Sequence, residues 1–251
     1  MNDLNRSALA KGGATSLQTK AEAELASTRE RVLVSWSGGK DSCMALEQVL
    51  NDDRFQVLAL LTTLTRESDC ISMHGVRRLL LERQAESLGI PLQPVIIPRR
   101  ASNQEYEAAL EQALAGYREA GLAQMVFGDL FLEDIRSYRE ALFARLGIKP
   151  IFPLWKRDTS ALIRDFISRG FRSAVTCVDS KSLPSSFAGC VIDSEFLARL
   201  PHTVDPCGEN GEFHTFVFDG PLFRRPIRFT PGEVRLEDNH YFCDLVPAEN
   251  S

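Results

Sequence analysis

The sequence predicts an α/β fold in which a parallel sheet with helices on both faces is followed by a smaller α+β domain. Short apolar runs alternate with amphipathic helical patterns from residue 31 to about residue 150. A glycine-rich turn directly follows the first of these runs. After Pro150 the pattern changes to extended runs interrupted by proline and glycine. Alternating strands and helices are typical of βαβ units with parallel strands.

Four strands are expected in the first part of the chain, at residues 32–35, 55–62, 92–97 and 124–127. Helices are expected between them because apolar residues recur at the helical period. The first helix follows the glycine-rich turn from residue 43. The clearest apolar stripe consists of Tyr106, Ala109, Leu110, Ala113, Leu114 and Tyr117. A further helix is expected at residues 133–146, with Ile135, Tyr138, Leu142 and Leu146 facing inward.

The two ends of the chain differ from this regular region. Residues 1–28 contain few large apolar side chains, which predicts a flexible tail with a short helix at residues 20–28. Beyond Pro150, Asp158 is a candidate cap for a helix ending near Gly170. A strand at residues 171–178, a helix at 193–200 and several extended runs at 213–246 complete the smaller domain.

The composition excludes several classes of protein. Hydrophobic residues make up 44% and charged residues 25%, as in ordinary globular proteins. The net charge of −5 makes nucleic acid an unlikely partner. No apolar run could span a bilayer and no signal-peptide core is visible, so we expect a cytoplasmic protein with no membrane contact. The six cysteines form no C-x-x-C pair, which indicates neither a zinc nor a dithiol site.

The glycine-rich turn has the chemistry of a phosphate-binding site. It reads Ser37-Gly38-Gly39-Lys40-Asp41-Ser42. The two glycines let the backbone N–H groups approach an anion, and the helix that follows directs its positive end to the same place. The serines add hydroxyl donors and Lys40 adds a positive charge. Asp41 could hold Mg²⁺ or cap the helix.

This run resembles the PP-loop of the ATP pyrophosphatases. The P-loop pattern fails because Val34 replaces its first glycine and Asp41 follows the lysine. The resemblance implies a Rossmann-like domain of the adenine nucleotide alpha hydrolase type, which uses ATP and Mg²⁺. We accordingly expect a flexible tail at residues 1–28, a PP-loop ATP-binding domain at 29–153 and a substrate-binding domain at 154–251.

Other candidates lie where predicted strands end, because ligands of such sheets bind beyond the carboxyl ends of strands. Thr62 ends the second predicted strand, where adenosine would lie, although threonines are common in strands. His74 is expected at the start of the second helix, where it contacts the nucleotide or is satisfied by backbone. Gly128 and Asp129 follow the fourth strand and complete the predicted nucleotide site.

A second group of candidates lies between Asp205 and Thr215. Asn210-Gly211 is a hairpin signal, so the flanking Glu209 and Glu212 could be charges of a solvated turn. Alternatively, the two carboxylates line a cleft, where they bind ammonium or accept a proton from an attacking amine. The pattern of residues leaves both interpretations open.

Four segments together resemble the diphthine–ammonia ligase family of PP-loop proteins. They are residues 37–42, Gly128-Asp129, residues 147–155 and residues 208–215. The resemblance covers roughly residues 31–228. It implies an enzyme that uses ATP and ammonia to amidate a carboxylate through an acyl-adenylate, with diphthine on elongation factor 2 as the best-understood acceptor. It also implies catalytic roles for Lys40, Glu209 and Glu212, in which the carboxylates position ammonia.

The chain departs from the family pattern at two positions, where Asn210 replaces glycine and His214 replaces glutamate. The eukaryotic proteins are also expected to carry an additional C-terminal region. These differences are compatible with a bacterial branch that adenylates or amidates a small molecule, for example one linked to cobalamin. A tRNA-modifying PP-loop enzyme and a non-catalytic adenine-nucleotide sensor are also compatible with the motif. The oligomeric state is left open, a dimer included.

Overall fold

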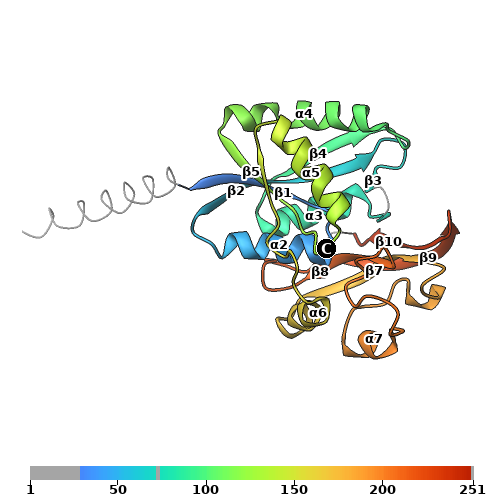
Figure 1. Ribbon diagram of the computed structural model, residues 1–251. Coiled ribbons are helices and arrows are strands. Elements are labelled where there is room, and N and C mark those ends of the chain that lie inside the picture. The colour runs from blue at the N-terminus through green and yellow to red at the C-terminus, as the bar shows by residue number, and fades with distance from the viewer. Residues whose placement is uncertain (1–28, 72–73, 250–251) are drawn as a thin grey trace, which may run out of the picture.

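The computed structural model describes residues 29–71 and 74–249. The tail and short helix predicted within residues 1–28 lie outside the described residues. The described chain forms a mostly parallel sheet and a separate antiparallel sheet, with helices around both (Figure 1). The predicted α/β fold class, with a Rossmann-like sheet and a smaller C-terminal α+β part, is confirmed.

The first sheet has six strands. The parallel strands are β1 (Glu30–Ser35), β2 (Phe55–Thr65), β4 (Leu92–Ile97), β5 (Leu122–Val126) and β6 (Lys149–Ile151). They lie in the order β4-β2-β1-β5-β6. The short strand β3 (Cys70–Ile71) pairs antiparallel with the end of β2. All four predicted strands are present, whereas β3 and β6 are too short to show a periodic pattern.

The helices that cover this sheet are α2 (Lys40–Leu50), α3 (Arg78–Leu88), α4 (Asn103–Glu119) and α5 (Glu133–Arg145). In Figure 1, α4 and α5 cover one face, and α2 and α3 lie between the two sheets. The inward positions predicted at Ile135 and Tyr138 are wrong, because these side chains are 37% and 38% exposed. The buried residues of α5 are Leu142 and Phe143, in its C-terminal half.

The second sheet has the order β8-β7-β10-β9 and is antiparallel throughout. Its strands are β7 (Arg172–Asp179), β8 (Phe213–Asp219), β9 (Phe229–Glu237) and β10 (His240–Pro247). With it pack α6 (Thr159–Ser168), the 3₁₀ turn η1 (Ser185–Phe187) and α7 (Ser194–Arg199). Asp158 caps α6 as predicted, accepting a 2.6 Å hydrogen bond from the N–H of Ala161.

Two apolar clusters hold the described chain together. One lies beneath α4 and α5 and includes Leu110, Leu114 and Phe143. The other joins the two sheets, since Leu46 of α2 and Phe216 of β8 both belong to it. Because this second cluster is continuous, the carboxyl ends of the parallel strands are held beside the C-terminal sheet. The domain boundary expected at residues 153–154 stays a prediction.

Candidate active site

The glycine-rich turn connects β1 to α2 and is held by the helix α3 and by β8 of the second sheet. Gly38 has a φ of +73°, which favours glycine. Its carbonyl accepts hydrogen bonds from Gln84 Nε2 of α3 at 3.0 Å and from the N–H of Val217 in β8 at 2.8 Å. The N–H of Lys40 donates to Thr215 Oγ1, also in β8, at 3.0 Å. The C-terminal sheet therefore forms part of the support of the turn.

Two backbone amides of the turn already have protein acceptors. Besides that of Lys40, the Gly39 N–H donates to Ser37 Oγ at 3.2 Å. Ser42 Oγ donates to the carbonyl of Gly39 at 2.9 Å and lies 3.2 Å from Ser37 Oγ. The Lys40 ammonium is consequently the prominent donor that the turn offers to an anion, and the two serine hydroxyls would have to leave their present acceptors to add to it.

The turn opens into a cavity of about 840 Å³ whose walls come from both sheets. This volume lies in the range of ordinary small-molecule sites. The structure brings nine of the predicted site residues to its surface: Ser37, Gly39, Lys40, Asp41, Ser42, His74, Gly128, Asp129 and Glu209. Glycine at position 128 permits close packing, because a Cβ there would lie 2.7–2.9 Å from backbone atoms of Asp41 and Ser42.

Lys40 and Asp41 form an ion pair at the N-terminus of α2. Lys40 Nζ lies 2.8 Å from Asp41 Oδ2, and the lysine is 4% exposed. Burial by itself lowers the pKa of Lys40, but the charge of Asp41 and the more distant Glu209 outweigh it and hold the pKa above its ordinary value. Lys40 therefore carries its positive charge at neutral pH. The alternative in which Asp41 caps α2 is wrong, because the N-cap is Gly39 and Asp41 is already in the helix.

Asp41 and Asp129 both place a buried carboxylate oxygen beside the cavity. Asp41 Oδ1 and Asp129 Oδ2 are buried without a hydrogen-bond partner among the described residues. Arg139 Nη1 lies 3.0 Å from Asp129 Oδ2, an ion-pair distance without hydrogen-bond alignment. Burial raises the pKa of Asp129, and Arg139 partly opposes this. No cluster of three or more metal-ligating side chains occurs in the described ranges, so a metal here would need further ligands from water or a bound phosphate.

Glu209 faces this group from the loop before β8. Its Oε1 accepts a hydrogen bond from the N–H of Leu130 at 2.9 Å, which bridges the two parts of the chain. Burial raises the pKa of Glu209 to about 7; the Leu130 N–H opposes this rise and Asp41 adds to it. A carboxylate with this pKa can accept a proton near neutral pH.

Glu212 is not among the residues that line the cavity. It is 5% exposed. Its Oε1 accepts from the Asp205 N–H and from Asn210 Nδ2, each at 3.0 Å, and its Oε2 accepts from the Asn210 N–H at 2.9 Å. These hydrogen bonds hold the loop that carries Glu209, and the catalytic role expected for Glu212 stays a prediction. The hairpin expected at Asn210-Gly211 is also absent, because residues 205–212 form successive turns before β8.

The structure places three other predicted residues differently from their expected positions, and their roles stay predictions. The carbonyl of Gly38 faces α3 and β8, and this residue does not line the cavity. Thr62 does not line it either, because β2 continues to Thr65 and leaves Thr62 inside the sheet, 1% exposed. His74 does reach the cavity, but it lies in the loop before α3, which begins only at Arg78.

Several residues of the cavity wall are not among the predicted site residues. Arg139 of α5 is one, and its guanidinium lies 4.2 Å from the ring centroid of Phe127. His214 of β8 stacks on His74 with a centroid distance of 4.3 Å. Burial, with the charge of Lys40 adding to it, lowers the pKa of His214 to about 4, so this imidazole is neutral at pH 7. Asp238 and Asn239, from the turn between β9 and β10, His240, the first residue of β10, and Lys181, after β7, also line the cavity.

A parallel sheet with Ser-Gly-Gly-Lys-Asp-Ser after its first strand defines the class of PP-loop proteins, and family comparisons agree. The model of the diphthamide synthase N-terminal domain matches residues 30–150, and the model of the diphthamide synthase C-terminal domain matches residues 158–249. The chain belongs to the diphthine–ammonia ligase family.

Individual relatives extend the likeness to most of the chain. A protein named diphthine–ammonia ligase from Danio rerio is 29% identical, over 86% of this chain and 92% of the relative. The one from Homo sapiens is 28% identical, over 86% and 89%. The one from Schizosaccharomyces pombe is 26% identical over 86% of this chain, which spans 38% of that longer protein.

These lengths correct one expectation. A long additional region is not general among the eukaryotic relatives, since the chain spans most of the zebrafish and human proteins. Within the described ranges, the helices are too short or too polar to cross a membrane.

Proposed function

We propose that this protein is an ATP-dependent ligase that adenylates a carboxylate, releases pyrophosphate and transfers ammonia to form an amide. The names of the relatives support this interpretation. The observation that carries it is the meeting of Lys40, from the PP-loop, and Glu209, from the loop before the second sheet's β8, in one cavity. One is a fixed cation and the other a carboxylate that can exchange a proton at neutral pH.

The triphosphate of ATP binds at Lys40 and the hydroxyls of Ser37 and Ser42. Asp41 fits Mg²⁺, because its buried Oδ1 has no partner among the described residues and a carboxylate oxygen is a ligand that Mg²⁺ prefers. The metal would neutralise phosphate charge when bound. Asp129 offers a second carboxylate oxygen beside the same cavity.

In the first step, an oxygen of the acceptor carboxylate attacks the α-phosphorus of ATP. The bond between the α-phosphorus and the bridging oxygen breaks, pyrophosphate leaves with that electron pair, and an acyl-adenylate remains. Negative charge grows on the leaving phosphates. Lys40 is held in place by Asp41 and by packing over the Phe213 ring, at 5.6 Å from its centroid. A preorganised cation of this kind lowers the barrier without having to reorient.

In the second step, ammonia attacks the acyl carbon, the carbon–oxygen bond to AMP breaks, and AMP leaves. The nitrogen must lose one proton, which Glu209 accepts. With a pKa of about 7, the carboxylate is partly ionised at neutral pH and can take this proton. His214 and His74 are neutral at this pH, so the positive charges of the cavity wall come from Lys40, Arg139 and Lys181.

The acceptor that the relatives' names indicate is diphthine. A small carboxylic acid is the second candidate. One observation supports this second candidate. His214, where this chain departs from the family pattern, lies in the cavity wall and stacks on His74. The chemistry of both steps is the same for either acceptor.

Thiolation of tRNA is disfavoured by the state of Cys207. Burial raises the pKa of this thiol to about 12, and Sγ donates to the carbonyl of Thr159 at 3.3 Å. A thiol that stays protonated is a poor nucleophile.

Isotope exchange tests the adenylation step. The protein is incubated with ATP, Mg²⁺, labelled pyrophosphate and an acceptor, without ammonium. The proposal expects label to enter ATP only when the acceptor is present, because an acyl-adenylate reverses to ATP. Tight ATP binding with no exchange for diphthine-bearing elongation factor or a pool of small acids would instead support a nucleotide sensor.

A further inference from the structure

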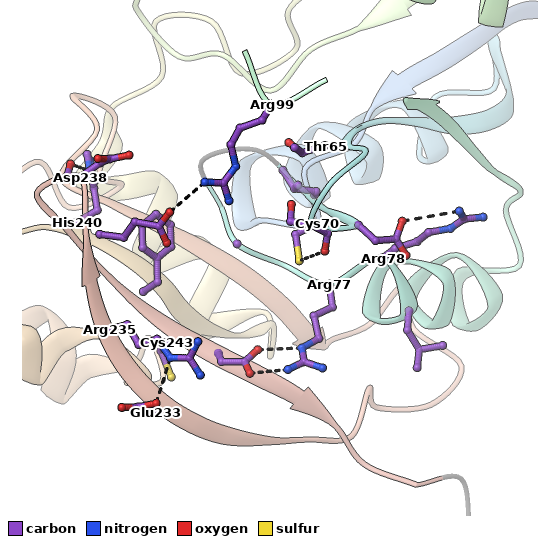
Figure 2. A pocket seen from close by; sticks show the side chains of 18 of the residues that line it. Thr65, Cys70, Arg77, Arg78, Arg99, Glu233, Arg235, Asp238, His240 and Cys243 are labelled. Atoms are coloured by element: carbon purple, nitrogen blue, oxygen red, sulfur yellow. Dashed lines mark hydrogen bonds and ion pairs between the residues drawn. The ribbon is translucent and has the colours of Figure 1, made fainter. Parts of the chain in front are cut away.

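A second cavity, of about 950 Å³, adjoins the nucleotide cavity. Its walls are the start of α3, the loop after β4, and the β9–β10 hairpin (Figure 2). Asp238 and His240 line both cavities. Both residues belong to the tip of the hairpin, where Asp238 and Asn239 have positive φ values of 46° and 65°. The hairpin tip is therefore the point at which the two cavities meet.

Five arginines line this second cavity: Arg77, Arg78, Arg99, Arg100 and Arg235. Five carboxylates line it as well: Asp69, Glu233, Glu237, Asp238 and Asp244. The formal charges cancel, which disfavours a polyanion such as RNA. The floor is apolar, with Ile71 and Cys243 at 8% and 4% exposure. These features suit a ligand with an apolar body and few charged groups.

The arginines differ in how firmly they are held. Arg77 binds Asp244 with two hydrogen bonds, of 2.9 and 2.5 Å, and so ties α3 to β10. Arg99 is held less firmly, since its Nη1 lies 3.4 Å from Glu237 Oε1 and both side chains are about 60% exposed. An exposed ion pair of this kind contributes little to the stability of the fold. Arg100 makes no ion pair within the described ranges. Arg99 and Arg100 can thus take a new carboxylate, and Figure 2 shows Arg99 directed across the cavity toward the hairpin.

We propose that this second cavity holds the body of the acceptor, and that the acceptor carries an anionic group besides the carboxylate that reacts. The inference rests on the proposed function. The reacting carboxylate passes the hairpin tip at Asp238 and His240 into the nucleotide cavity. The second anionic group binds Arg99 and Arg100. A free dicarboxylic acid and a glutamate-bearing polypeptide both supply this chemistry.

Direct binding tests the proposal without turnover. The full chain is labelled on arginine nitrogen and titrated, with AMP present, with glutarate or with the peptide acetyl-Glu-Ala-Glu-amide while the guanidinium Nε–Hε signals are followed by NMR. We expect one probe to shift cavity arginines saturably, and to bind at least about tenfold more weakly to the R99A/R100A double variant. The control R54A, which removes the exposed partner of Asp52, should bind as the wild type does.

The probe that shifts the signals identifies the source of the anionic group. Glutarate indicates a small acid, and the peptide indicates a polypeptide acceptor. If neither probe shifts the cavity arginines, or if R99A/R100A binds as tightly as the wild type, the proposal is wrong. R100A alone provides a milder change should the double variant fold poorly.

Steady-state kinetics separates this inference from the proposed function. With an acceptor that supports AMP formation, R99A/R100A should raise the acceptor KM by about tenfold and leave kcat and ATP affinity unchanged. Saturable probe binding without AMP formation for any acceptor would overturn the ligase function and keep the anion site. AMP formation with an unchanged acceptor KM in the variant would overturn the site and keep the ligase.

Discussion

Thr215 Oγ1 accepts a 3.0 Å hydrogen bond from the backbone N–H of Lys40, across 175 residues of sequence. Both residues are buried, with exposures of 2% and 4%. The bond joins the first turn of α2 to β8, so the C-terminal sheet sets the position of the PP-loop lysine. Nucleotide binding should consequently depend on a residue outside the PP-loop motif.

Replacing Thr215 by valine should therefore weaken both folding and nucleotide binding. Valine keeps the shape but removes the acceptor, which leaves the buried N–H of Lys40 unsatisfied at a cost of about 1–3 kcal/mol. Urea unfolding and ATP titration measure the two effects. Thr215→Ser retains the hydroxyl and should stay close to wild type. Unchanged stability and ATP affinity in Thr215→Val would show that the contact does not matter.

Glu209→Gln should abolish the pH dependence of amide formation. In the wild type, the rate at constant free ammonia should rise with pH up to about 7 and then level off, because only the ionised carboxylate accepts a proton. The variant should be slower by about 10²- to 10⁴-fold with a flat profile over this range. Initial rates from pH 5.5 to 8.5 test this expectation.

Two controls accompany that profile. Total ammonium is adjusted at each pH so that free ammonia stays constant, and ATP affinity is measured in parallel. A Glu209→Gln protein that keeps the wild-type rate and profile would exclude Glu209 as the base. Loss of ATP binding would point to a structural role.

The raised pKa of Glu209 also predicts how stability varies with pH. Burial keeps this carboxyl protonated in the folded protein up to about pH 7, whereas in the unfolded chain it ionises near pH 4.5. Its contribution to stability is present below the unfolded pKa and is lost as pH rises through the folded value. Glu209→Gln should match the wild type near pH 4 and be more stable at pH 8, by about 1 kcal/mol after screening.

Thermal or urea unfolding at the two pH values measures this difference. A shift of about 1 kcal/mol corresponds to roughly 2–4 °C in Tm for a chain of this size. Equal stability of the two proteins at pH 8 would mean that the Glu209 carboxylate ionises without a penalty in the folded state.

Glu212→Ala should lower the stability of the protein and leave the chemistry of the folded fraction largely intact. The change leaves the N–H groups of Asp205 and Asn210 without the acceptor that they have in the structure, at about 1–3 kcal/mol. Unfolding curves and the activity of the folded fraction measure the two effects, with the exposed Glu119 of α4 changed to alanine as the control. A stable Glu212→Ala protein that binds ATP but forms no amide would support the catalytic role expected from the sequence.

The parts of this molecule that can be predicted from the sequence are the local ones. The PP-loop can be recognised because the strand, turn and helix are contiguous, and five of its residues line the cavity as a result: Ser37, Gly39, Lys40, Asp41 and Ser42. Arg139 carries no such signal, and the sequence does not reveal the contact of Thr215 with the PP-loop, because the closeness of both residues to the loop depends on packing between distant elements. No pattern within a short window reports that packing.

Glu212 and Thr62 show two further reasons why the observed site differs from the predicted one. Gly208 and Gly211 have φ values of +68° and +86°, and the chain turns at these residues. As a result, Glu209 faces the cavity, whereas Glu212 bonds to its own loop. The pattern of residues predicts a strand end at Thr62, but β2 continues because Leu64 and Thr65 pair with β3. A two-residue strand gives too weak a signal to be seen beforehand.

Product analysis by mass spectrometry tests the central claim most directly. The protein is incubated with Mg²⁺, ATP and ammonium, together with diphthine-bearing elongation factor or, in parallel, a pool of small carboxylic acids. The account predicts equal amounts of AMP, pyrophosphate and a new amide in one of the two incubations. ADP with inorganic phosphate, or bound ATP that stays uncleaved in both, would contradict it.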